Sequence, residues 1–217
     1  MKRQWSIGWY SVATDGTDWH GALQGVQLAG HIAKRVADLS LHQYDMDFCA
    51  RLLKENGARL VGEYDDLSQS LWIAVLTKFI SCFGNSKARA LLNKDKVYGS
   101  DLKALQAFGW ISNLRDKHVV HDENSYYGAT AFAWLEKDGN VRQVGAMTYV
   151  TRLDPGLVDA LRYLVERAQE HIRIAITDAG EALLAEVQAM SPEARAALEK
   201  IRIALPTDLY ADLVNRR

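Results

Sequence analysis

Proline interrupts helices more strongly than any other residue, so its positions constrain the fold of this chain. The 217 residues include three prolines, Pro155, Pro192 and Pro206. The first two follow Asp154 and Ser191, and an Asp or Ser directly before a proline is typical of the start of a helix. All three prolines therefore lie where helices are expected to begin or end.

Apolar residues recur at helical spacing along most of the chain. Leu157, Leu161, Leu164 and Val165, for example, fall on one face of a helix. The same pattern predicts helices over about 20–38, 44–54, 65–82, 101–121 and 155–189, with a short helical turn within 87–97. Ser100 is the expected N-terminal cap of the helix at 101–121. The fold class is therefore predicted to be mainly α.

One part of the chain departs from the helical pattern. Residues 127–135 and 141–150 alternate and are rich in aromatic and β-branched side chains. Asp138-Gly139 between them is a strong signal for a tight turn. We therefore expect a β-hairpin, at about 127–150, inserted into a helical domain that covers 1–190. Residues 191–217 are expected to form a short C-terminal helical tail.

Charge and composition restrict the partners, the cellular compartment and the membrane segments that can be expected of this chain. The net charge is −1, so an anionic partner must bind a local basic patch. The two cysteines, Cys49 and Cys82, are far apart, which favours free buried thiols and a cytoplasmic protein. The N-terminus lacks the apolar stretch of a signal peptide. The longest apolar run, LWIAVLTKFISCF, contains Lys78 and is too short for a membrane span.

Ionisable residues are concentrated in the segment 113–124, which reads NLRDKHVVHDEN. On an α-helix, at roughly 100° per residue, Arg115, His118, His121 and Asp122 share about one third of the circumference. Arginine presents a planar fork that matches a phosphate, and histidine exchanges protons near neutral pH. Such a cluster suits the cleavage of RNA without a metal ion, with attack by the 2′-hydroxyl.

Two other interpretations of this segment are open. It can be the solvated end of a helix, where mixed charges are common. It can also be a metal site built on His118, His121 and Asp122, as in a metal-dependent phosphohydrolase. The spacing of these two histidines, however, differs from the four-residue spacing of zinc-binding pairs on helices.

The stretch LRDKHVVHDEN resembles the motif of the HEPN superfamily, which consists of small helical nucleotide-binding and ribonuclease domains. That motif is an arginine, commonly followed by a polar residue, and a histidine after four to six further residues. Arg115, Asp116 and His121 match it, and the variant is most similar to abortive-infection HEPN proteins. One branch, paired with nucleotidyltransferase antitoxins, has a tyrosine two residues after the histidine, where this chain has Glu123.

The resemblance implies a HEPN-like helical bundle and a metal-independent endoribonuclease that needs no cofactor. Arg115 and His121 would be the catalytic pair, Asp116 would orient or tune them, and His118 would be auxiliary. The protein would be a homodimer acting on RNA as a toxin or antiphage effector, with an antitoxin or a defence-system protein as a further partner. A HEPN module that binds nucleotide, RNA or protein without catalysis is the alternative.

Residues around the motif are candidates for binding RNA. Residues 85–118 contain seven basic and three acidic residues, a net charge of +4 on an otherwise acidic chain. Such a patch would attract a phosphate backbone. Lys103 and Lys117 belong to it, and Tyr126 and Tyr127, which follow the motif, are candidates for stacking on bases.

Overall fold

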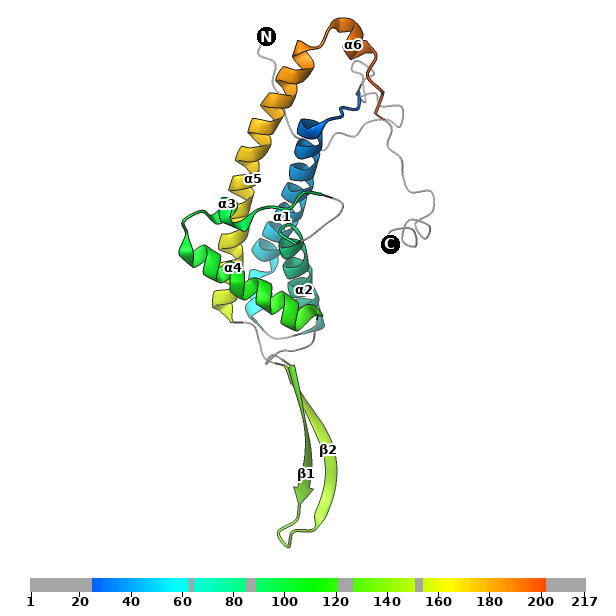
Figure 1. Cartoon of the computed structure of the whole chain (residues 1–217). Coiled ribbons are helices and arrows are strands. Elements are labelled where there is room, and N and C mark those ends of the chain that lie inside the picture. Colours follow the sequence, from blue (N-terminus) through cyan, green and yellow to red (C-terminus); the bar gives the residue numbers. More distant parts are fainter. Residues whose placement is uncertain (1–24, 63–64, 85–88, 121–126, 151–153, 202–217) are drawn as a thin grey trace. The chain divides into compact units, whose positions relative to one another are not determined.

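A computed structural model of the chain describes residues 25–62, 65–84, 89–120, 127–150 and 154–201. The side chains of residues 118–120, 127, 149 and 150 lie outside this description. Within these ranges the fold is mainly helical, as predicted, with one two-stranded antiparallel sheet (Figure 1). The elements are α1 (His31–Val61), α2 (Asp66–Ser81), α3 (Lys94–Tyr98), α4 (Leu102–Leu114), the π-helix η1 (Arg115–Val120), β1 (Tyr127–Leu135), β2 (Val141–Val150), α5 (Pro155–Ala189) and α6 (Pro192–Ala196).

The chain divides into two compact units, and α1 and α5 contribute to both. The first unit consists of residues 1–37 and 176–217, and the second of residues 38–175. In the first unit, the Gln27 amide donates to the Glu199 carbonyl at 2.7 Å, and the Ile201 amide donates to the Gly25 carbonyl at 3.1 Å. These bonds join the segment before α1 to the segment after α6. The expected domain boundary near residue 190 stays a prediction.

The helix α1 corrects the expectation of two separate helices at 20–38 and 44–54. It is continuous from His31 to Val61, and the part of the first predicted helix before residue 25 lies outside the described residues. The polar residues Asp38, His42 and Asp45 interrupt the apolar pattern, but all three are buried. They belong to the packed face of the helix, so the interruption does not mark a loop.

Side-chain caps set the starts of several helices. Asp65 and Ser68 form a reciprocal capping box at α2, where the Ser68 amide donates to Asp65 Oδ1 at 2.6 Å. Asp101, and not the predicted Ser100, caps α4, because its carboxylate accepts the Ala104 amide at 3.0 Å. The predicted start of α6 is confirmed, since the Ser191 hydroxyl accepts from the Ala194 amide.

An apolar core fills the second unit. α2, α4 and α5 bury one face each, and the residues of this core that are at most 1% exposed include Trp72, Val75, Leu76, Phe79, Ile111, Leu161, Leu164 and Ile172. Phe83 stacks on Tyr98 and meets Phe108 edge to face, with ring centroids 4.8 Å apart in the second pair. This aromatic cluster joins the end of α2 to α3 and α4. None of the helices within the described ranges combines the length and apolar character required to cross a bilayer.

The hairpin has the predicted bounds. Ala131 pairs with Ala146 near its middle, and the register shifts after Trp134, where Arg142 is the extra residue of a bulge. Gly139 has a φ of 88° in the turn, which explains the glycine there. Large apolar side chains are exposed on the hairpin at Trp134, Leu135, Val141, Val144 and Met147. Apart from Arg142, the two strands carry no charged residue.

Candidate functional site

The charged segment begins where α4 changes into the π-helix η1 at Arg115. η1 contacts both α2 and α4. A π-helix bonds residue i to residue i+5 and therefore turns only about 80° per residue. Backbone position 118 then lies roughly 120° around the axis from position 115. This corrects the α-helical arrangement, which put the two positions about 60° apart. Short π-helical segments are frequent at functional sites.

Arg115 lies against the C-terminal end of α2. A Cβ added to Gly84 would be 3.9 Å from Nη2 of Arg115, and the Gly84 amide donates to the Ile80 carbonyl in the last turn of α2. Nη1 of Arg115 pairs with Oδ1 of Asp116 at 2.8 Å. A cation is favourable at this end of a helix, where carbonyl groups lack partners. The Arg115 side chain remains 29% exposed.

The other predicted site residues are described to different extents. Asp116 is half-exposed, and Lys117 in η1 and Lys103 in α4 are both exposed. His118 lies in η1 and Tyr127 begins β1, but their side chains are outside the description. His121, Asp122 and Tyr126 lie outside the described residues altogether. Within the described ranges, no group of three His, Cys, Asp or Glu residues is arranged to hold a metal ion.

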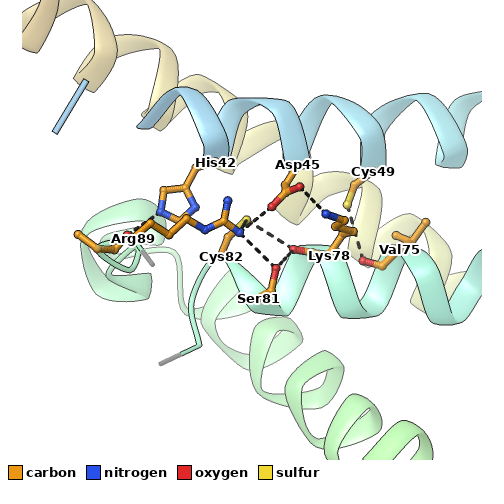
Figure 2. A network of polar contacts seen from close by, with 9 residues as sticks. His42, Asp45, Cys49, Val75, Lys78, Ser81, Cys82 and Arg89 are labelled. Atoms are coloured by element: carbon orange, nitrogen blue, oxygen red, sulfur yellow. Dashed lines mark hydrogen bonds and ion pairs between the residues drawn. The ribbon is translucent and has the colours of Figure 1, made fainter. Parts of the chain in front are cut away.

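A second polar cluster, which was not predicted from the sequence, is buried between α1 and α2 (Figure 2). Asp45 is at its centre and its side chain is 6% exposed. Its Oδ1 accepts from Lys78 Nζ at 3.0 Å, and its Oδ2 accepts from Arg89 Nη2 at 2.6 Å. The same Nη2 of Arg89 lies 3.4 Å from the Ser81 hydroxyl. One carboxylate therefore joins α1, α2 and the segment that follows α2.

The next residue of that segment is held by two more side chains of α1. Oδ2 of Asp38 accepts from the Ala90 amide at 3.1 Å, and His42 Nε2 lies 2.7 Å from the Ala90 carbonyl. Asp38, His42 and Asp45 are spaced four and three residues apart, so they lie on one face of α1. We call these three residues with Arg89 the buried polar cluster. It fixes residues 89–90 against α1, next to the end of α2 that contacts Arg115.

The sequence contains a signal for the buried polar cluster. Asp38, His42 and Asp45 continue the helical stripe formed by Met46, Cys49 and Leu53, all of which are buried. Polar residues on an apolar stripe are rarely left without partners, because an unpaired buried charge is costly. Such a pattern predicts a buried partner of opposite charge. It does not identify Arg89, which is distant in the sequence.

The two cysteines are free and buried, as predicted. Burial raises the pKa of Cys49 and of Cys82 to about 12. Cys49 donates to the Val75 carbonyl and Cys82 to the Lys78 carbonyl. Because the thiolate is the reactive form, both groups behave as packing residues next to the buried polar cluster.

We expect the stability of the protein to fall at mildly acidic pH because of His42. Since the Ala90 carbonyl can only accept, Nε2 carries the ring proton and Nδ1 has no partner within the described residues. Burial is the main cause that lowers the pKa of His42 below its usual 6.5. The unfolded chain therefore binds this proton more readily, and the free energy of unfolding decreases as pH falls below about 6.5.

This expectation can be checked by urea unfolding between pH 5 and 8, comparing the parent with His42→Gln. The parent should lose stability through the pH range near and below 6.5, whereas the glutamine variant should show a smaller slope there. His31→Gln is the matched control, because His31 is an exposed residue of the same helix. Equal slopes in the parent and His42→Gln would contradict the assignment.

A scan against protein-family models, a search of curated proteins and a search of solved structures each found no match.

Proposed function

We propose that the protein is a metal-independent endoribonuclease of the HEPN type, with its site at η1. The observation that carries the proposal is the set of contacts made by the Arg115 side chain, together with its exposure. Its guanidinium pairs with Asp116 and lies close to the end of α2, and the Arg115 side chain as a whole is 29% exposed. A positioned and accessible arginine fork is suited to a phosphate.

The chemistry assigns a role to each residue of the motif. The 2′-hydroxyl of RNA attacks the neighbouring phosphorus and loses its proton to a base, and the 5′-oxygen of the next nucleotide leaves and takes up a proton. His121 serves in this proton transfer, and Arg115 stabilises the charge that develops on the phosphorane. Asp116 orients Arg115 through their 2.8 Å ion pair. The products are a 2′,3′-cyclic phosphate and a 5′-hydroxyl.

The partners follow from the same proposal. The exposed Lys117 and Lys103 support contacts with an RNA backbone. The exposed apolar side chains of the hairpin support a homodimer, because an isolated two-stranded hairpin is marginally stable in water and is stabilised by further packing. A role as a toxin or antiphage effector, controlled by an antitoxin or another defence protein, belongs to the proposal.

The proposal is tested by incubating the purified protein with single-stranded RNA, with and without EDTA, and by identifying the ends of the products. We expect cleavage at the same rate in both conditions, with cyclic phosphate and 5′-hydroxyl ends. Cleavage that EDTA abolishes would favour the metal site at His118, His121 and Asp122 instead. A folded protein that binds RNA and leaves it intact would favour the non-catalytic module. The observation that favours this alternative is the ion pair with Asp116, which partly neutralises Arg115.

A further inference from the structure

A groove of about 500 Å³ lies in the second unit, between the α3–α4 junction and α5. Its residues are distinct from the motif at η1. From the α3–α4 side, Lys96 and Ser100 line it, and from α5 the lining residues include Arg167, His171 and Ile174. The volume is within the range of about 300–1,000 Å³ that is usual for small-molecule sites.

Hydrogen bonds between α5 and the α3–α4 side hold the two walls of the groove together. The Tyr163 hydroxyl on α5 donates to Oδ2 of Asp101 at 2.6 Å, and Oδ1 of the same carboxylate caps α4. Tyr163, Arg167 and Ile174 are spaced four and seven residues apart, so α5 presents them on one face. At the α3–α4 junction, Gly99 has a φ of 57°, and a Cβ there would meet nothing within 4 Å. The groove is therefore open at this point.

The two acidic residues of the lining already have partners. Glu170 forms a two-point contact with Arg173, at 3.0 Å from Nε and 2.7 Å from Nη2, and this contact is the main cause that lowers the pKa of Glu170. Asp101 accepts from Tyr163, which likewise lowers its pKa. Both carboxylates therefore stay ionised, and their strongest contacts are made to groups other than Lys96 and Arg167.

Lys96 and Arg167, unlike the two carboxylates, make no such contacts with the described residues. Within the described part of the chain, no hydrogen bond or ion pair engages the side chains of Lys96 and Arg167. The Ser100 hydroxyl and amide likewise have no partner among these residues. Arg167 is within the electrostatic influence of both Asp101 and Glu170, which favours its placement in the groove. Two cations and two neutral donors thus remain available to a ligand.

We propose that this groove binds a small phosphorylated molecule of about the size of a mononucleotide. Arg167 and Lys96 contact the phosphate, since a guanidinium fork and an ammonium group are the side chains that best match a phosphate dianion. The Ser100 hydroxyl and amide add hydrogen bonds to the same group. Ile174, a residue that is 50% exposed, provides apolar surface for the carbon-rich part of the ligand.

The proposal is tested by calorimetric titration of the full chain at 0.15 M salt with AMP, adenosine, inorganic phosphate and a short single-stranded RNA. We expect AMP to bind at least about tenfold more tightly than inorganic phosphate, and adenosine not to bind, because both the phosphate and the apolar part contribute. Arg167→Ala should weaken AMP binding by about tenfold or more, and Arg167→Lys by less.

Two control variants locate the binding. Arg162→Ala removes the same charge from α5 outside the groove, where Arg162 pairs with Asp159, so AMP binding should be unchanged. Arg115→Ala should also leave AMP binding unchanged, which separates this groove from the proposed cleavage site. Lys96→Ala provides a second test, if Arg167→Ala lowers the melting temperature. The proposal is overturned if AMP does not saturate, if Arg167→Ala and Lys96→Ala bind AMP as the parent does, or if only RNA depends on Arg167.

Discussion

Replacing Arg115 by alanine is expected to lower the rate of RNA cleavage by about 10²–10³-fold, because it removes a positioned donor for the phosphorane charge. His121→Ala should cause a loss of about 10²–10⁴-fold, because it removes the group that transfers protons. The two effects should not add in the double variant, since both residues act on one transition state. Single-turnover cleavage of a labelled RNA measures all three rates.

Three controls make this result specific. Arg115→Lys keeps the charge but loses the planar fork, so it should recover only part of the rate. Arg51→Ala removes an exposed arginine of α1 and should cleave like the parent. Because Arg115 also packs at the end of α2, the melting temperature of each variant must be measured. A folded Arg115→Ala protein with the parental cleavage rate would refute the proposed site.

Replacing Asp45 by alanine is expected to lower the free energy of unfolding by about 3–5 kcal/mol, because it leaves a charged partner buried without its counter-ion. Arg89 is the partner that would lose most, because its side chain is 12% exposed and its charge would stay buried. The Lys78 side chain is 46% exposed and can reach water. The loss also removes the contact that holds residue 89 against α1. Urea unfolding at pH 7 measures the change.

An exposed ion pair and a double variant provide the comparison. Asp159→Ala breaks the pair between Asp159 and Arg162, whose side chains are 71% and 41% exposed, and should leave the urea midpoint almost unchanged. Combining Asp45→Ala with Arg89→Met should be less destabilising than the sum of the single changes, because no buried charge then remains unpaired. Equal effects of Asp45→Ala and Asp159→Ala would show that the buried polar cluster contributes no more than a surface pair.

Local signals explain why much of the fold was predictable. Asp154-Pro155 begins α5, and that helix continues to Ala189, as expected. The alternating strands around Asp138-Gly139 form the hairpin with the predicted bounds. In each case the relevant interaction joins residues that are close in the sequence. A cap, a tight turn and a periodic face depend on neighbours within a few residues.

The candidate site was predictable to a smaller extent. The residue types of the motif were evident, but the π-helical turn at Arg115 was not, because it depends on how η1 packs against α2 and α4. The cap of α4 is Asp101 and not the predicted Ser100. The Asp101 carboxylate also accepts a hydrogen bond from the hydroxyl of Tyr163, 62 residues away. The roles of His121 and Tyr126 stay predictions.

The sequence by itself determined the mainly helical character of the chain, the hairpin and the start of α5. It also showed that one short segment concentrates an arginine, acids and histidines. Only the tertiary structure decided that α1 is one helix with buried acids, that Asp45 pairs with Arg89, and that Lys96 and Arg167 line a common groove. The physical reason is distance along the chain. Charges that are far apart in sequence influence one another only after the core has packed and excluded water, which makes their pairing strong and their isolation costly.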